Sequence, residues 1–178
     1  VMYWGNPTAS SQSSGASVFS SANGYCCVMH MNGNVLDSTG FTAPVNNGAT
    51  PTNAVIGSTA WDLGSGGISV ANINNFPAGL NPASTSEIWL RARKVNQWSE
   101  IMGWGNQNAY GWNTWIMQIG FWQSMGGSPI LPAPVTCYGP GQVYGVAPIA
   151  AQQWYHVVYT SKNGTGAIYV NGVLDATA

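Results

Sequence analysis

Charged side chains are the scarcest feature of this sequence. Only 5% of its 178 residues are charged, with four Lys or Arg, five Asp or Glu, and a formal net charge of −1. Globular proteins usually carry about 25% charged residues. Because binding to nucleic-acid phosphates needs clustered Lys and Arg, this composition argues against a nucleic-acid partner.

Long apolar runs and helical periodicity are also missing. No stretch approaches the ~20 apolar residues of a membrane span, so we expect no membrane insertion. Gly, Pro, Asn and Ser interrupt the chain every few residues, which leaves no room for a convincing helix. Hydrophobic residues nevertheless make up 45% of the chain, including nine Trp and eight Tyr. The balance is typical of a secreted or cell-surface β protein, and we expect an extracellular location.

Cysteine is scarce and its spacing leaves two interpretations open. Cys26 and Cys27 are neighbours and Cys137 is distant. A disulfide between neighbours is strained because their Cα atoms lie only ~3.8 Å apart. A bond from Cys137 to Cys26 or Cys27 fits an oxidising compartment. Three buried free thiols are the alternative, since free cysteine is commonly buried.

Short alternating segments between the breaks predict an all-β, two-sheet antiparallel sandwich. The clearest alternation is at 154–160, and the pairs Asn163-Gly164 and Asn171-Gly172 supply the positive φ of two tight turns. The chain should therefore return as a partner strand and then begin another at Val173 and Leu174. Further strands are expected at residues 1–6, 24–33, 85–94, 99–106 and 114–122, with a hairpin formed by 58–64 and 66–72.

Four segments together resemble one family. They are "VMHMNGNVLDSTGFTAPVNNG" (28–48), "TSEIWLRAR" (85–93), "GNQNAYGWNTWIMQIG" (105–120) and the closing "WYHVVYT…GAIYVNG" (154–172). In this order they are similar to the motifs of bacterial laminin G-like, concanavalin A-like lectin domains. The resemblance implies a jelly-roll sandwich over residues 25–178.

Residues 1–24 resemble something else, the end of a bacterial extracellular domain of unknown function that precedes laminin G-like domains. The resemblances together imply that 1–24 are the tail strand and linker of an upstream module. Family members continue for another strand or two after the "YVNG" turn, so the domain over 25–178 is expected to lack its last strands. Three explanations stay open: the given chain was cut before those strands, the first strand fills their place, or a neighbouring molecule supplies a strand. The assembly edge expected on this basis comprises Val1, Met2, Tyr3, Trp4, Val173 and Leu174.

Catalysis is not expected. Glycoside hydrolysis needs two carboxylates that flank the scissile bond. The related glucanases carry an E-x-D-x-E run, and no such run occurs here. Related domains often bind Ca²⁺ through clustered carboxylates, which makes Asp37 in "LDSTG" the candidate ligand. Asp37 has no acidic neighbour in the sequence, and an Asx turn capped by its own side chain is the better interpretation. We therefore expect neither an enzyme nor a cofactor.

The aromatic residues between 98 and 122 are the best functional feature. Sugar rings stack on indoles, while Asn and Gln hydrogen-bond their hydroxyls, and "GWGNQNAYGWNTW" interleaves both types. Burial in the core is the alternative for many of these rings. Trp104, Tyr110 and Trp122 flank turns and are expected to be exposed. The predicted carbohydrate site comprises Trp104, Tyr110, Trp112, Trp122, Asn106 and Gln107.

Two functions follow from these features. The first is a non-catalytic, extracellular lectin-like module that binds polysaccharide or mediates surface adhesion. The alternative is a structural subunit that assembles with copies of itself into a filament or layer by strand exchange. Low charge favours the second, because little repulsion opposes close packing. The resemblance and the aromatic residues favour the first.

Overall fold

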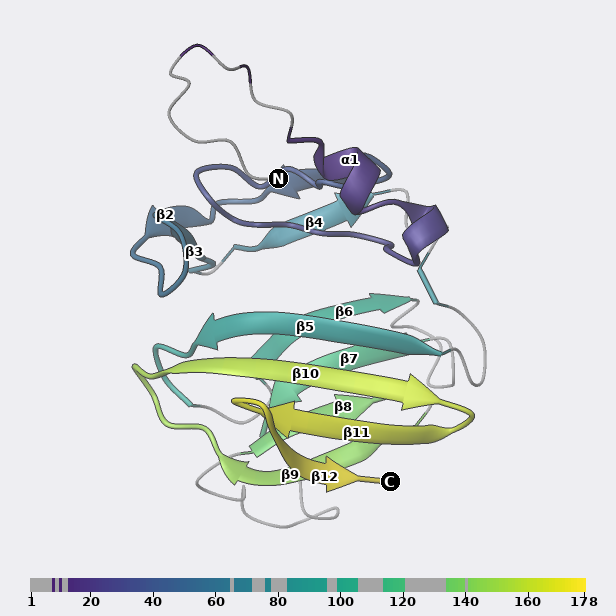
Figure 1. Ribbon diagram of the computed structural model, residues 1–178. Coiled ribbons are helices and arrows are strands. Elements are labelled where there is room, and N and C mark those ends of the chain that lie inside the picture. Colours follow the sequence, from purple (N-terminus) through teal and green to yellow (C-terminus); the bar gives the residue numbers. More distant parts are fainter. Residues whose placement is uncertain are drawn as a thin grey trace. The chain divides into compact units, whose positions relative to one another are not determined.

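The structure is a computed structural model of the chain (Figure 1). It describes residues 8, 10, 13–64, 66–71, 76–77, 83–95, 99–105, 114–120, 134–139 and 141–178. The chain divides into two compact units, Val1–Asn75 and Phe76–Ala178. The strand expected at 1–6 lies outside the described residues. The expected module boundary after residue 24 stays a prediction.

The described part of the first unit contains two short helices and two strand pairs. The helices are α1 (Gly15–Val18) and η1 (Ser21–Asn23). The strands are β1 (Ala43–Asn46), β2 (Thr50–Thr52), β3 (Ala60–Asp62) and β4 (Ile68–Ala71). β1 pairs antiparallel with β4, and β2 pairs antiparallel with β3, so one pair is nested within the other along the sequence.

The hairpin expected from 58–64 and 66–72 is therefore wrong, because β3 and β4 each pair with an earlier strand. The backbone explains the difference. A Cβ on Gly66 would lie 2.1 Å from the carbonyl oxygen of Asn47, and the N–H of Asn47 donates to the carbonyl of Gly67. The glycines thus bring the chain tightly against the end of β1 rather than back onto β3.

The strand expected at 24–33 is also wrong. Within the described residues this segment forms only an isolated bridge, between Met29 and Asp37. The Asp37 side chain accepts a 2.9 Å hydrogen bond from the N–H of Val28. Side-chain acceptors of this kind compete with a strand ladder for backbone donors.

The second unit is a sandwich of two four-stranded antiparallel sheets, seen one in front of the other in Figure 1. One sheet has the order β12-β11-β10-β5 and the other the order β6-β7-β8-β9. This confirms the expected all-β, two-sheet antiparallel sandwich. The first sheet comprises β5 (Ser84–Arg91), β10 (Trp154–Lys162), β11 (Thr165–Val170) and β12 (Val173–Thr177). The second comprises β6 (Ser99–Gly105), β7 (Thr114–Ile119), β8 (Pro134–Tyr138) and β9 (Val143–Pro148).

Strict alternation builds the core between these sheets. Along β10, buried residues alternate with half-buried ones, as the sequence predicted. On β5, Leu90 is buried, whereas Trp89 and Arg91 turn outward. Burying each large apolar side chain contributes about 1.5–3 kcal/mol. The most deeply buried core side chains are Met117, Val135, Cys137, Val143, Ile149, Val157, Tyr159 and Ile168.

The closing strands follow the predicted turns. Asn163 and Asn171 have φ of 53° and 51°, and the glycine after each also has positive φ. β12 begins at Val173 as expected and pairs with β11. Its Asp175 carboxylate accepts hydrogen bonds from the N–H groups of Val146 (3.0 Å) and Ala147 (2.7 Å) on β9. One side chain thus ties the two sheets together.

Candidate functional site

The outer face of the β12-β11-β10-β5 sheet carries the best-defined cluster of functional side chains. Glu87 and Trp89 lie two residues apart on β5, so both point to the side opposite the buried Leu90. His156 lies opposite Trp89 in the β5–β10 register. We call Glu87, Trp89 and His156 the outer-face cluster.

The three side chains of the outer-face cluster contact one another. The rings of Trp89 and His156 are stacked, with centroids 4.9 Å apart and planes 28° apart. His156 Nε2 lies 2.9 Å from Glu87 Oε1. This contact is a hydrogen bond between the imidazole and the carboxylate. The Glu87 side chain is 62% exposed and Trp89 is 43% exposed, so both remain available to a ligand.

The backbone of His156 is held by the turn between β11 and β12. His156 N–H donates to Asn171 Oδ1 (2.9 Å), and Asn171 N–H donates to the His156 carbonyl (2.8 Å). This reciprocal pair fixes the strand from which the imidazole projects. Since His156 covers one face of the Trp89 ring, the position of the indole also depends on this turn.

β5 is the outermost strand of this sheet among the described strands. The Trp89 ring face turned away from His156 therefore lies toward the edge of the sheet. Arg91, the next outward residue on β5, places its guanidinium 5.8 Å from the Trp154 ring centroid. The Arg91 guanidinium, at one end of this outer face, is therefore engaged in a cation–π contact with Trp154. The partly exposed Trp89 ring and the exposed Glu87 carboxylate lie two residues apart on the same face of β5.

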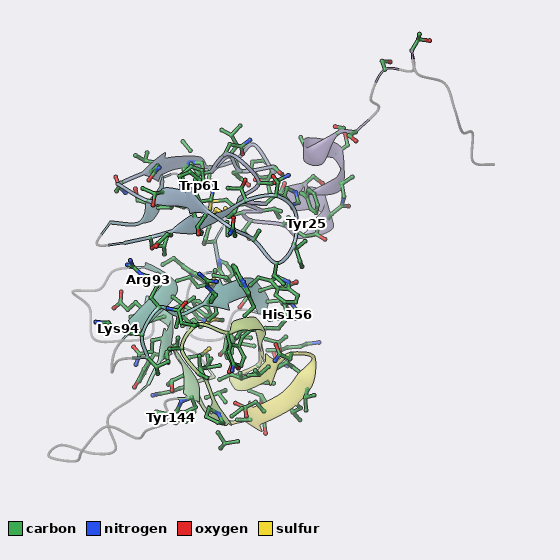
Figure 2. The ribbon with its side chains drawn as sticks, turned by 90° about the vertical axis from the view of Figure 1, so that its left-hand side faces the viewer. Tyr25, Trp61, Arg93, Lys94, Tyr144 and His156 are labelled. Atoms are coloured by element: carbon green, nitrogen blue, oxygen red, sulfur yellow. The ribbon has the colours of Figure 1, made fainter. Side chains whose placement is uncertain are left out.

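The opposite sheet carries a second exposed aromatic pair. Tyr138 and Tyr144 meet edge to face with ring centroids 6.0 Å apart, and Tyr144 is 46% exposed. Burial, together with the neighbouring Tyr144, raises the pKa of Tyr138 to about 12. His156 and Tyr144 project from different sides of the second unit (Figure 2).

Trp104 does not occupy the exposed position expected of it. It is half-buried and stacks on Trp115, with ring centroids 4.1 Å apart. Its Nε1–H donates to the Pro77 carbonyl (2.9 Å), and Phe76 packs against its edge. The ring therefore packs against the core, and its only polar group is already satisfied. The other predicted carbohydrate-site residues, Tyr110, Trp112, Trp122, Asn106 and Gln107, lie outside the described residues.

Asp37 is surrounded by hydrogen-bond donors. It accepts five hydrogen bonds, from backbone N–H groups and hydroxyls of Val28, Thr39 and Thr42. The bond from Thr39 N–H, two residues on, confirms the Asx turn. Burial alone would raise the pKa of this carboxyl, but these donors hold it well below its usual range. They also compete with a cation for the oxygen lone pairs. Calcium binding at Asp37 stays a prediction.

Metal-binding clusters of three or more His, Cys, Asp or Glu are not found in the described part of the chain. The three cysteines are present as thiols. Cys26 and Cys27 are half-buried in the first unit, and Cys137 is buried in the second. A disulfide from Cys137 to Cys26 or Cys27 stays a prediction, because it would join the two units.

The expected assembly edge is described only at its C-terminal part. Val173 and Leu174 on β12 are 70% and 53% exposed. Val1, Met2, Tyr3 and Trp4 lie outside the described residues. Whether these segments take part in assembly stays a prediction.

Sequence reasoning missed the outer-face cluster although its signal was present. The alternation over 85–94 already placed Trp89 and Arg91 on the side opposite Ile88 and Leu90. The register that sets His156 opposite Trp89 depends on the pairing of strands far apart in sequence. Without that register, the Glu87–His156 contact cannot be predicted from the sequence.

The two-sheet antiparallel sandwich is consistent with a concanavalin A-like domain. The family model described as Concanavalin A-like lectin/glucanases superfamily, a laminin G-like model, matches residues 62–178, and the chain belongs to this family. No curated protein and no solved structure matches the chain. Among the described residues, no helix has the length and apolar character to cross a membrane.

Proposed function

We propose that this chain is a non-catalytic, extracellular lectin-like module that binds polysaccharide and thereby mediates surface adhesion. The observation that carries the proposal is the exposed Trp89 ring beside the Glu87 carboxylate. The family match supports it, because the superfamily includes lectins.

The chemistry of the outer-face cluster suits a sugar ring. The apolar C–H face of a pyranose packs against the open side of the indole, which supplies large contact area at low entropy cost. Glu87 Oε1 is taken by His156, and the rest of the carboxylate accepts hydrogen bonds from sugar hydroxyls. The aromatic ring thus provides contact area and the carboxylate provides orientation.

The distribution of the carboxylates supports a non-catalytic role. A glycosidase places two carboxyl groups on either side of one bond. Glu87 lies on β5 and Glu100 on β6, in different sheets of the sandwich. Asp175, the remaining acid of the second unit, is engaged by two backbone N–H groups of β9.

The test is affinity electrophoresis against a panel of soluble polysaccharides, comparing the unmodified chain with Trp89→Ala. The expected result is retardation by at least one polysaccharide and an affinity loss of at least tenfold in the variant. Tyr144→Ala removes an equally exposed ring from the other sheet and should keep the affinity. If Tyr144→Ala lost polysaccharide affinity and Trp89→Ala kept it, the proposed site at Trp89 would be overturned. Absence of retardation by every polysaccharide would overturn the function.

Self-assembly is the second candidate function, and it is favoured by the exposed apolar residues on two outermost strands. β12 pairs with β11 alone, and β9 pairs with β8 alone, among the described strands. Val146 on β9 is 74% exposed and Val173 on β12 is 70% exposed. Outermost strands of this kind are templates for pairing with another chain.

Negative-stain electron microscopy beside sedimentation velocity tests this second function. Ordered filaments or layers that Val173→Lys dissolves would support it, because charge on an edge strand blocks pairing. Val55→Lys, at an exposed position of the first unit, is the matched control and should leave assemblies intact. Monomers under all conditions would contradict it.

A further inference from the structure

Sulfur-containing side chains are concentrated in one short segment of the first unit. The stretch "CCVMHM" at 26–31 holds two of the three cysteines and two of the six methionines of the chain. Cys26, Cys27 and Met29 are each half-buried, so none of the three is sealed away from solvent. Neither proposed function uses this segment. Thiolate and thioether sulfurs are the donors that soft metal ions select.

Backbone hydrogen bonds fix this segment against the residues around Asp37. The N–H of Val28 donates to Asp37 Oδ1 (2.9 Å), and the Val28 carbonyl accepts from the N–H of Ser38 (2.8 Å). Met29 forms an antiparallel bridge with Asp37. Directly opposed residues of an antiparallel pair share one face, with Cβ atoms about 4.5–5.5 Å apart. The Met29 side chain therefore lies on the same face as the Asp37 carboxylate.

The Cys27 thiol lies beside the same carboxylate. Cys27 Sγ is 3.7 Å from Thr42 Oγ1, and the Thr42 hydroxyl donates to Asp37 Oδ2 (2.8 Å). Burial raises the pKa of Cys27 most, the Thr42 hydrogen bond lowers it, and the nearby Asp37 and Cys26 raise it further. Cys27 and Met29 thus flank one carboxylate, and Cys26 is close enough to Cys27 to influence its ionisation.

The Asp37 carboxylate is already engaged by hydrogen bonds, which leaves the sulfur atoms as the donors. Its two oxygens accept five hydrogen bonds from Val28, Thr39 and Thr42. Its negative charge nevertheless favours a cation next to the sulfurs.

The donor set also discriminates between metals. Structural zinc sites are almost always tetrahedral, with ligands drawn from Cys, His, Asp and Glu. The described part of the chain has no group of three such residues that could hold an ion. Cu(I) is satisfied by fewer donors and accepts the thioether of methionine as well as thiolate. A soft monovalent ion therefore matches the segment better than zinc.

We propose that Cys26, Cys27 and Met29 form a binding site for one Cu(I) ion, independent of the outer-face cluster. The two thiolates and the thioether are the ligands. Each thiol releases its proton to solvent when the ion binds, because the thiolate is the metal ligand. The cysteine pair is adjacent in the chain, so both sulfurs reach one ion without any rearrangement of distant segments.

The experiment is an anaerobic titration of the reduced full chain with Cu(I) in competition with bicinchoninate, with native mass spectrometry to count the bound ions. The expected result is one Cu(I) per chain, bound at least a hundredfold more tightly than Zn(II), which is titrated separately against a zinc indicator. Cys26→Ala and Cys27→Ala should each weaken Cu(I) binding at least tenfold, and Met29→Leu at least threefold. Bound Cu(I) should also protect Cys26 and Cys27 of the unmodified chain from iodoacetamide.

Cys137→Ala and Met102→Leu are the matched controls, because they remove a thiol and a thioether from the second unit. Both should bind Cu(I) like the unmodified chain. Absence of Cu(I) binding, equal affinity for Zn(II), or equal losses in Cys27→Ala and Cys137→Ala would overturn the proposal. So would a Met29→Leu variant that binds as tightly as Met102→Leu. Thermal unfolding of each metal-free variant shows that it is folded before titration.

Discussion

His156 on β10 contacts Glu87 on β5 diagonally rather than directly across the ladder. The direct partner of His156 is Trp89, and the direct partner of Glu87 is Val158. The imidazole therefore bridges two adjacent positions of β5, stacking on one and hydrogen-bonding to the other. It holds the indole and the carboxylate in one fixed arrangement.

His156 is thus predicted to be a positioning residue for polysaccharide binding. His156→Phe keeps a ring against Trp89 and should retain most of the affinity, whereas His156→Ala leaves the indole unsupported and should weaken binding about three- to tenfold. Affinity electrophoresis of both variants measures the difference. Equal losses in the two variants would show that the Glu87 hydrogen bond, and not the stacking, positions the site.

The second prediction concerns Asp37. Asp37→Asn replaces one of the two carboxylate oxygens with an NH₂ donor. The donors to that oxygen lose their partner, because Oδ1 accepts the N–H groups of Val28 and Thr39 while Oδ2 accepts the N–H of Thr42 and two hydroxyls. The free energy of unfolding of the first unit should fall by about 1–3 kcal/mol, measured by urea denaturation. Asp62→Asn is the matched control; Asp62 accepts from Gly64 N–H across an exposed turn, and its replacement should cost less.

The same network predicts how stability changes with pH. The folded-state pKa of Asp37 is depressed below its ordinary value of 3.8. Its contribution is therefore fully present above pH ~4 and is lost as the pH falls through the lower folded-state pKa. In an acid titration the stability difference between the unmodified chain and Asp37→Asn should be full above pH ~4 and shrink progressively as the pH falls from there toward the folded-state pKa. A constant difference at all pH values would contradict the assignment.

The third prediction is a graded reactivity of the thiols. Cys137 is 0% exposed, and burial raises its pKa strongly, whereas Cys26 and Cys27 are only partly buried, with their pKa values also raised by burial. Because the thiolate is the nucleophile, iodoacetamide should label the neighbouring pair first and Cys137 only after unfolding. Mass spectrometry of tryptic peptides measures this. A Cys137 that resists labelling after unfolding without reductant would instead reveal the disulfide.

The fourth prediction concerns Gly166 on β11. A Cβ there would lie 2.1 Å from the Gly141 carbonyl oxygen and 2.6 Å from Val143 Cγ2. The Gly141 carbonyl also accepts the Tyr159 hydroxyl (2.7 Å), so moving it disturbs the core. Gly166→Ala should destabilise the second unit by about 1–3 kcal/mol or more. Gly67→Ala, with nothing within 4 Å of its added Cβ, should be nearly neutral. Similar melting temperatures for the two variants would refute the close approach.

Local patterns were sufficient for the closing strands of the second unit. The alternation of Trp154 to Thr160 and the two Asn-Gly turns lie within a few residues of one another, and each specifies its own backbone geometry. The sandwich class and the family followed from these and similar segments. What remained hidden was pairing between distant strands, which brought Glu87 to His156.

The first unit was predicted less well because its organisation depends on non-local contacts. The run around Gly64 to Gly67 has the composition of a hairpin turn, yet Gly66 lies against Asn47 instead. In the second unit the same limit applies to Trp104, which flanks an expected turn and was predicted to be exposed, whereas Trp115 and Phe76 pack against it. The amino-acid sequence near an aromatic residue does not show which distant rings pack against it.

The nested pairing of the first unit sets an order in which its strands can form. β2 and β3 are separated by a short connection, whereas β1 and β4 are separated by both inner strands. Once β2 and β3 have paired, only the segments around Asn47 and Gly66 remain between the ends of β1 and β4, and the entropy lost in closing that loop falls. The inner pair should therefore form first and act as a template for the outer one, so that weakening β2 or β3 slows folding of the unit more than an equal weakening of β1 or β4.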